Sequence, residues 1–241
     1  MILKVVTSNP GKVEEFAEAF AGLGIGFEHV RISYGEPQVS TLEEVVEAGI
    51  RELRAKGLSD FLIDDSGMFV DHLRGFPGVY SSYVQKTIGN DGILRLMEGV
   101  SDRSAHFRCC IGCCIGGETI IVTGVSPGSV LCEPMGRGGF GYDPIFSPDG
   151  KRSFAEMPLE DKNVISHRGR AIGLLMKVYL KNILNYERRI MKRTGLWASL
   201  VYLWLWEPLT PVQIRADPLN HLTRGCSGLW GAGPARCKYQ T

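Results

Sequence analysis

The sequence has no excess of charge of either sign, because its 241 residues carry 27 Lys and Arg and 26 Asp and Glu. A balance this even creates no general field that would attract nucleic acid or an anionic membrane, so any phosphate-binding groups have to be local. The first residues, MILKVVTSNPGK, lack the basic region, long apolar stretch and cleavage site of a secretory signal. We therefore expect a cytoplasmic protein with no nucleic-acid partner.

The sequence also lacks an apolar run long enough to cross a membrane. The run from Leu196 to Trp206 has eleven residues, whereas a spanning helix needs about 20. All four tryptophans lie after residue 185, and residues 186–241 are more basic than the rest and are broken by Pro and Gly. We predict one domain over residues 1–185 and a poorly ordered extension over 186–241, with a partner-binding segment as the alternative.

Cysteines are too few and too scattered for a disulfide scaffold, since there are seven in 241 residues. Four of them form a cluster at Cys109, Cys110, Cys113 and Cys114. The C-x-x-C spacing admits a zinc site, but no second pair follows at zinc spacing. The segment HFRCCIGCCIGGETIIV reads as two strands joined at Gly116-Gly117, in which thiols pack as small apolar groups. Structural cysteines are thus the favoured interpretation.

Strands and helices alternate within residues 1–185. An apolar strand over 2–6 precedes a helical pattern over 13–23, and a second amphipathic helix over 42–53 precedes a strand over 61–63. Strand followed by helix, twice, indicates an α/β fold. Further on we expect a helix over 88–97, a pair of strands within 105–131 and a closing helix over 172–183.

A small polar loop, Thr7 to Lys12 (TSNPGK), separates the first strand from the first helix. Asn9 can cap this helix with Pro10 at its first position, which leaves backbone N–H groups facing the loop. Lys12 adds a positive charge. These features are typical of a phosphate site, although the spacing of a Walker loop is missing, and an ordinary strand-to-helix turn explains the segment equally well.

Two acidic segments could bind a metal ion. Thr41 and Glu44 fit the S/T-x-x-E capping box, and capping is the simpler explanation for them. Asp64 and Asp65 directly follow an apolar strand, at the sheet edge where ligands of α/β proteins bind. Carboxylate oxygens of this kind suit a hard ion such as Mg²⁺. A solvated turn is the alternative.

A glycine-rich segment, GRGGFGYDPIF, follows the predicted strand pair. Its four glycines within six residues let the backbone approach a ligand closely, and Phe140 and Tyr142 can stack on a flat ring. Lys162, His167 and Arg168 add donors near the start of the last helix. Together with the carboxylates, these groups describe a pocket for a nucleoside triphosphate and a metal.

Four segments, in this order and spacing, resemble the inosine/xanthosine triphosphate pyrophosphatase family, which removes aberrant purine nucleotides: TSNPGKVEEF, DDSGMFVDHLRGFPGVYSSYV, GGFGYDPIF and EDKNVISHRGRA. The resemblance covers residues 1 to about 184 and is strongest to archaeal members. It implies an α/β fold in which an elongated mixed sheet forms two lobes around a nucleotide cleft. It also implies Mg²⁺-dependent hydrolysis of a triphosphate to a monophosphate and pyrophosphate, by a homodimer.

The resemblance also implies roles for individual residues. The residues expected at the triphosphate are Thr7, Ser8, Asn9, Pro10, Gly11 and Lys12. Glu44 and Asp65 would hold Mg²⁺, Asp65 would also be the general base, and Ser66 would contact the substrate beside it. The residues expected to enclose the base and sugar are Phe140, Gly141, Tyr142, Asp143, Lys162, His167 and Arg168.

Other readings stay open at this point. A related pyrophosphatase group of similar fold acts on pyrimidine or modified nucleotides, but its opening loop typically carries Ser-x-Arg-Arg, which TSNPGK lacks. A nucleotide-binding module without turnover would not need a base, so the presence of both Glu44 and Asp65 argues against it. A zinc or nucleic-acid binding protein built on the cysteines and the basic extension is the remaining alternative.

Overall fold

The computed structural model describes residues 3–23, 25–35 and 37–194. The predicted extension over 186–241 therefore lies mostly outside the described residues, and its predicted disorder is not addressed by them. Within the described part, no helix is long and apolar enough to cross a membrane.

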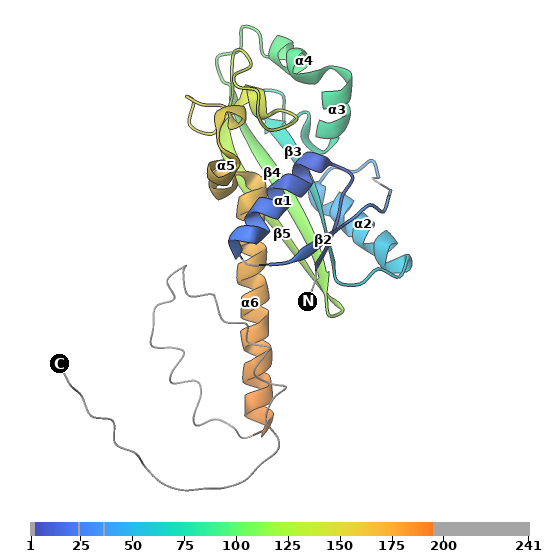
Figure 1. The fold of residues 1–241 in the computed structure, drawn as a ribbon. Coiled ribbons are helices and arrows are strands. Elements are labelled where there is room, and N and C mark those ends of the chain that lie inside the picture. The colour runs from blue at the N-terminus through green and yellow to red at the C-terminus, as the bar shows by residue number, and fades with distance from the viewer. Residues whose placement is uncertain (1–2, 24, 36, 195–241) are drawn as a thin grey trace, which may run out of the picture. The chain divides into compact units, whose positions relative to one another are not determined.

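Six strands form one mixed sheet in the order β2-β1-β3-β4-β5-β6 (Figure 1). Their bounds are Leu3–Val6 (β1), Phe27–Val30 (β2), Phe61–Val70 (β3), Ser104–Ile115 (β4), Glu118–Val130 (β5) and Phe146–Ser147 (β6). Strand β1 pairs in parallel with β2 and β3, whereas all later pairings are antiparallel. The mixed sheet confirms the predicted α/β class.

Strand β3 is longer than the three residues expected from its apolar run. It continues through Asp64 and Asp65 to Val70 and pairs with β4 along its whole length, so these carboxylates lie within a strand and not in a turn after it. Strand β3 extends this far because its antiparallel partner β4 continues beside it. The parallel partner β1 ends at Val6, so the side of β3 that faces β1 is left open where the carboxylates begin.

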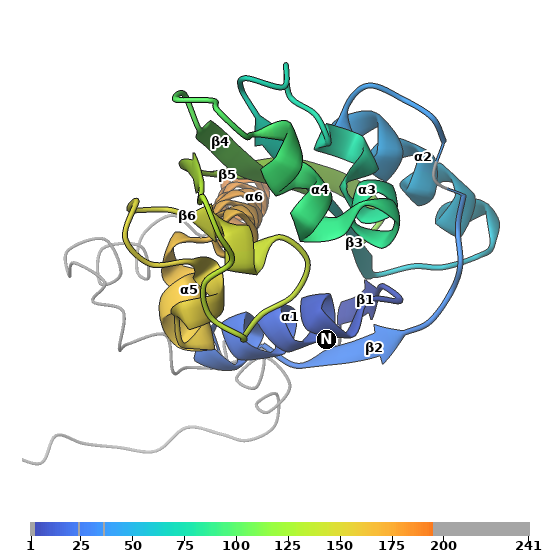
Figure 2. The ribbon, with the colours of Figure 1, turned by 90° about the horizontal axis from the view of Figure 1, so that it is seen from above.

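Helices cover both faces of the sheet (Figures 1 and 2). Their bounds are Pro10–Leu23 (α1), Leu42–Ala55 (α2), Ser81–Thr87 (α3), Gly89–Leu96 (α4), Leu159–Ile165 (α5) and His167–Thr194 (α6). Apolar residues of α1 and α6 pack on one face of β1, β3 and β4, and those of α2 pack on the other. A third core lies at the far end of β3 and β4, beneath α3 and α4.

The cysteine cluster belongs to these cores. Side chains alternate along β4, so Cys109 and Cys113 pack on the α1–α6 side while Cys110 and Cys114 pack on the α2 side. Burial raises the pKa of Cys110 and of Cys113 to about 12, so both remain thiols at neutral pH. The predicted turn is confirmed, since Gly116 and Gly117 adopt positive φ angles of 57° and 87° between β4 and β5.

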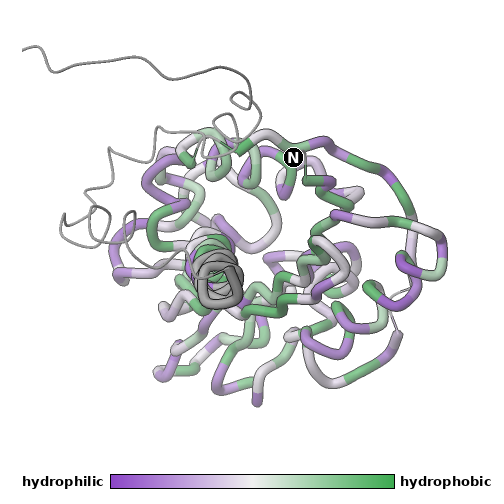
Figure 3. The backbone as a smooth tube through the Cα atoms, turned by 90° about the horizontal axis from the view of Figure 1, so that it is seen from below, coloured by the Kyte–Doolittle hydropathy of each residue, from purple (hydrophilic) through white to green (hydrophobic). Residues whose placement is uncertain are grey.

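The last helix, α6, begins at an N-cap and ends well past the sheet. Ser166 Oγ accepts a hydrogen bond of 3.1 Å from the backbone of Gly169, the usual geometry of an N-cap. Helix α6 then continues for 28 residues to Thr194, across the domain boundary predicted at residue 185. In Figure 3, hydrophobic segments gather along the central strands and hydrophilic ones lie on the outer loops.

Candidate functional site

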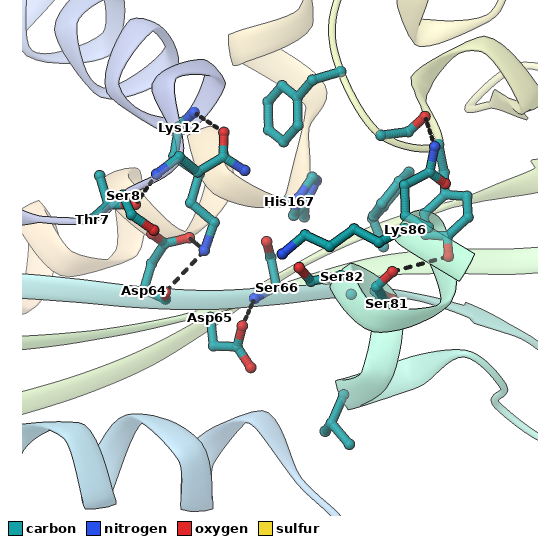
Figure 4. Close-up of a pocket in the computed structure, with 18 of the residues that line it drawn as sticks. Thr7, Ser8, Lys12, Asp64, Asp65, Ser66, Ser81, Ser82, Lys86 and His167 are labelled. Atoms are coloured by element: carbon teal, nitrogen blue, oxygen red, sulfur yellow. Dashed lines mark hydrogen bonds and ion pairs between the residues drawn. The ribbon is translucent and has the colours of Figure 1, made fainter. Parts of the chain in front are cut away.

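One cavity of about 680 Å³ brings together three of the predicted segments. Its wall includes Thr7, Ser8, Asn9 and Lys12 from the polar loop, Asp64, Asp65 and Ser66 from β3, and Phe140, Gly141, Tyr142, Asp143 and His167 from the glycine-rich loop and α6. These groups lie far apart in the sequence but face one space (Figure 4). The cavity is large enough for a small organic ligand.

The polar loop takes the predicted shape. Asn9 Oδ1 accepts hydrogen bonds from the backbone of Gly11 (2.9 Å) and of Lys12 (3.4 Å), which confirms that Asn9 caps α1. Pro10 and Gly11 form the first turn of α1 and are not among the residues that line the cavity. The ring of Phe140 lies against Gly11 so closely that a Cβ atom there would be 2.4 Å from the ring.

Lys12 points from α1 to β3. Its Nζ atom lies 3.2 Å from Asp64 Oδ2 and donates a hydrogen bond of 3.0 Å to the Asp64 carbonyl oxygen. Asp64 itself is only 4% exposed. Burial alone would raise the pKa of Asp64, but the charges of Lys12 and Arg168 outweigh it and lower the pKa to about 2. Asp64 is thus an anion that holds Lys12 in place.

Behind the cavity wall lies a chain of buried ion pairs. Arg168 Nη2 lies 2.9 Å from Asp64 Oδ2, and the Nη1 atom of the same guanidinium pairs with Glu15. Lys162 Nζ lies 2.5 Å from Glu15 Oε1 and 2.7 Å from Asp143 Oδ2. Every member has less than 5% of its surface exposed. Such groups are costly to bury unless they are paired in this way.

Glu15 is the member of this network that the sequence reasoning missed. A signal was present, because Glu15 falls on the same helical stripe as Lys12, Phe16 and Phe20, the side of α1 that becomes buried. A carboxylate on a buried stripe needs a cation, and Lys162 and Arg168 are the cations that it meets. Burial would raise the pKa of Glu15, but Arg168 and Lys162 lower it.

Lys162 and Arg168 occupy a different place from the one expected. Both were predicted to enclose the base and sugar, yet neither is among the residues that line the cavity, and both are bound to carboxylates. They lie behind Phe140, with Lys162 Nζ 5.1 Å and Arg168 Cζ 5.9 Å from the centre of its ring. In this structure they support the wall of the cavity.

The other side of the cavity is aromatic. His167 stacks on Phe107 with ring centres 4.6 Å apart, and its buried Nδ1 atom has no hydrogen-bond partner within the described part of the chain. Burial, followed by the charge of Arg168, lowers the pKa of His167 well below its usual value, so the ring is neutral at pH 7. Tyr142 donates a hydrogen bond of 3.0 Å to the Ser81 carbonyl oxygen. This side can accommodate a flat ring.

Asp65 lies in the middle of the wall and faces away from the Lys12–Asp64 pair (Figure 4). Its Oδ1 atom accepts a hydrogen bond of 2.9 Å from the backbone of Ser66. Unlike Asp64, it also lines a second hollow of about 760 Å³ that adjoins the first along α3. Ser66 Oγ accepts a hydrogen bond of 3.0 Å from Arg168, which connects the wall to the buried ion pairs.

Glu44 is engaged in capping. Its Oε2 atom accepts hydrogen bonds from the backbone of Ser40 (3.2 Å) and of Thr41 (3.0 Å), and Thr41 Oγ1 accepts one from the backbone of Glu44. The capping box is therefore confirmed. Glu44 is not among the residues that line the cavity, so its predicted role as a metal ligand stays a prediction.

Two cations in the cavity wall were not expected from the sequence. Lys86, on α3, directs its amine towards Ser66 and Ser82 (Figure 4). Arg31, directly after β2, contributes to the wall beside Thr7. Neither residue takes part in an ion pair within the part of the chain that the structure describes. The sequence around each of them contains no motif with a recognisable spacing, so neither residue could be identified from the sequence.

The carboxylates of the cavity wall supply part of a binding site for a hard cation such as Mg²⁺. Among the described residues, no three His, Cys, Asp or Glu side chains converge as a complete metal site. Asp64 Oδ1, however, is buried without a hydrogen-bond partner among the described residues, and Asp65, the next residue of β3, also lines the cavity. Mg²⁺ usually takes one or two protein carboxylates and fills its other positions with water and phosphate oxygens. The donor set suits such an ion.

Comparison with known proteins agrees with this geometry. The model of the Ham1 family matches residues 3–178. The chain belongs to the Ham1 family. It is 53% identical over 173 residues to the dITP/XTP pyrophosphatase of Thermococcus kodakarensis, covering 71% of this chain and 94% of that protein. It is 49% identical over 180 residues to the corresponding protein of Pyrococcus horikoshii, covering 73% of this chain and 97% of that protein.

Solved structures of the Ham1 family share the fold. A HAM1 protein from Coxiella burnetii matches with a TM-score of 0.63 and 30% identity, covering 75% of this chain and 100% of that one. A dITP/XTP pyrophosphatase from Mycobacterium abscessus matches with a TM-score of 0.54 and 32% identity, covering 73% of this chain and 97% of that one. The mixed sheet and its flanking helices are therefore the architecture of this Ham1 family member.

Proposed function

We propose that this chain hydrolyses non-standard purine nucleoside triphosphates (ITP, dITP and XTP) to the monophosphate and pyrophosphate. The observation that carries this proposal is the single cavity in which a capped helix start, two adjacent carboxylates and an aromatic wall face one another. The names of the most similar relatives, dITP/XTP pyrophosphatases, support the same substrate class.

Asp65 is the proposed general base. Water attacks the α-phosphorus, the bond between the α-phosphorus and the bridging oxygen breaks, and pyrophosphate leaves. Asp65 lines the cavity, and its proposed role is to orient this water and accept its proton. Asp64 forms ion pairs with Lys12 and Arg168. Environment thus separates the roles of two neighbouring carboxylates.

Mg²⁺ is the proposed metal, and Asp65 is its proposed ligand in the cavity wall. When bound, it neutralises charge on the phosphates and so lowers the cost of bringing an anionic chain next to carboxylates. Glu44 is proposed as a further ligand from the family resemblance alone. Lys12 is the proposed contact of the phosphates on the other side.

The base is proposed to bind between Phe140, Tyr142 and His167. Hypoxanthine and xanthine carry an acceptor oxygen at position 6, where adenine carries a donor amine. Backbone N–H groups and a ring N–H of neutral His167 satisfy the oxygen and leave the amine opposite unpaired donors. Sites built to hydrogen-bond one group reject the wrong group by about 10⁴ in favourable cases. A cytoplasmic homodimer is the proposed form of the enzyme.

The test is a panel of ITP, XTP, dITP and ATP assayed with the full chain and with Asp65→Asn. We expect pyrophosphate release from ITP in the presence of Mg²⁺, much slower release from ATP, and a loss of at least 10²-fold in kcat in the variant. Asp71→Asn, an exposed residue outside the cavity, is the matched control. Equal rates on ATP and ITP would refute the selectivity, and an undiminished Asp65→Asn would refute the base.

Glu44 requires a separate experiment because capping and metal binding predict different losses. Glu44→Gln keeps side-chain atoms that can complete the capping box but removes the anionic charge. If Glu44 binds Mg²⁺, the concentration of Mg²⁺ needed for half-maximal rate should rise at least tenfold while the melting temperature changes little. If it only caps α2, the Mg²⁺ requirement should match that of the wild type.

A further inference from the structure

The cations of the cavity are not equally available to a ligand. Lys12 is paired with Asp64 at 3.2 Å, and behind the wall Arg168 and Lys162 are paired with Glu15, Asp64 and Asp143. A triphosphate brings several negative charges, and paired cations can neutralise only part of them. The wall cations without an ion pair among the described residues are Arg31 and Lys86.

Arg31 stands where the carboxyl ends of three parallel strands meet. Strands β2, β1 and β3 lie side by side, and Val30 of β2 is in register with Val6 of β1. The next residues are Arg31 and Thr7, and Thr7 donates its backbone N–H to the Val30 carbonyl oxygen at 3.3 Å. Ligands of α/β sheets bind at this edge. Arg31 therefore flanks the polar loop directly.

The order of strands also indicates how a nucleotide would be oriented in the cavity. Arg31 follows β2 at one end of the sheet, whereas Phe140 and Tyr142 lie on the connection between β5 and β6 at the other end. Strand β3, which carries Asp65, lies between them in the order of strands. A nucleotide with its base against the aromatic wall and its α-phosphate near Asp65 can extend its outer phosphates towards β2.

We infer that Arg31 binds the outer two phosphates of the triphosphate, the part that leaves as pyrophosphate. A guanidinium can donate two parallel hydrogen bonds to phosphate oxygens, which suits the end of a flexible chain better than a point charge does. Arg31 is exposed and forms no ion pair within the described residues, so no existing pair has to be broken. The orientation of the nucleotide in this inference rests on the proposed function.

The test measures binding of inorganic pyrophosphate and of IMP, each with Mg²⁺, to the full chain by calorimetry. The variants are Arg31→Gln, Arg31→Lys and Arg51→Gln. Arg51→Gln is the matched control, because it removes the same charge from an exposed residue of α2 that does not line the cavity. We expect Arg31→Gln to weaken pyrophosphate binding about tenfold or more and IMP binding less than twofold. Arg31→Lys should fall between, and Arg51→Gln should match the wild type.

Several results would overturn the inference: no measurable pyrophosphate binding, an unchanged affinity in Arg31→Gln, an equal loss for IMP, or the same loss in Arg51→Gln. Hydrolysis of ITP by the wild type is measured separately. If the wild type binds pyrophosphate through Arg31 but hydrolyses none of the triphosphates, the proposed function fails and the anion site stands. If the wild type hydrolyses ITP but Arg31→Gln binds pyrophosphate as tightly as the wild type, only this inference fails.

Discussion

Glu15 is the residue on which the buried charges converge. Its carboxylate pairs with Lys162 on α5 and with Arg168 on α6, so one side chain of α1 connects three helices. Both cations also contact a carboxylate of the cavity wall, Asp143 and Asp64 respectively. The position of the wall therefore depends on a residue that does not line the cavity.

Replacing Glu15 by Gln should destabilise the protein strongly. The amide keeps the shape but leaves two buried cations with too little negative charge, and breaking a buried pair in this way costs about 3–5 kcal/mol. Glu14→Gln, on the exposed side of the same helix, should change stability by less than about 0.5 kcal/mol. Urea unfolding of both variants measures this. Equal stability of the two would show that the network contributes nothing net.

At the scale of elements, helix α1 and the glycine-rich loop are fitted to each other at one point. Gly11 lies under the ring of Phe140, where a Cβ atom would come within 2.4 Å of the ring. Phe140 is in turn fixed by a hydrogen bond of 2.8 Å from its backbone N–H to Asp143. The polar loop and the glycine-rich loop therefore meet directly at this contact.

Gly11→Ala should disturb this contact and Gly22→Ala should not, although both glycines are in α1. The added methyl group at position 11 forces Phe140 or the helix to move, which we expect to cost about 1–3 kcal/mol and to raise KM for ITP. At position 22 nothing lies within 4 Å, so the higher helix propensity of Ala should stabilise slightly, by up to about 1 kcal/mol. Thermal melting and KM measurements compare the pair. A normal KM in Gly11→Ala would refute the fit.

The elements that the sequence predicts well are those with strong periodicity or a local cap. The helices over 42–53 and 172–183 appear within α2 and α6, and Asn9 caps α1 as its residue type suggests. The length of β3 could not be predicted, because it depends on pairing with β4, some 40 residues later. Local sequence reports apolar runs, whereas strand ends depend on partners.

The candidate site, too, could be predicted from the sequence only in part. Motif residues such as Asp65, Ser66 and Phe140 line one cavity, but Lys162 and Arg168 do not line it and are bound by carboxylates that come from three different elements. Such pairings join residues more than 100 positions apart in some cases, for example Arg168 and Asp64. Residue type alone cannot show which cation is neutralised and which stays available.

At the scale of the whole molecule, the buried charges couple stability to pH. Burial, followed by the charges of Arg168 and Lys162, holds the pKa of His167 well below its usual value of 6.5, so the folded protein keeps this ring neutral. The unfolded chain takes up a proton there below pH 6.5. Asp64 behaves similarly at lower pH, since its pKa is about 2 in the folded protein against a usual value of 3.8.

Stability should therefore fall in two stages as the pH is lowered. In each stage the unfolded state binds the extra proton, and one proton corresponds to a slope of about 1.4 kcal/mol per pH unit. The first stage begins near pH 6.5 and belongs to His167, while Asp64 and Glu15, whose pKa values are also lowered in the folded protein, contribute only at lower pH. Urea midpoints from pH 8 to about pH 2.5 should show both stages in the wild type. His167→Gln should remove the first and keep the second, and a variant whose stability falls as steeply as the wild type between pH 6.5 and 5 would contradict the assignment.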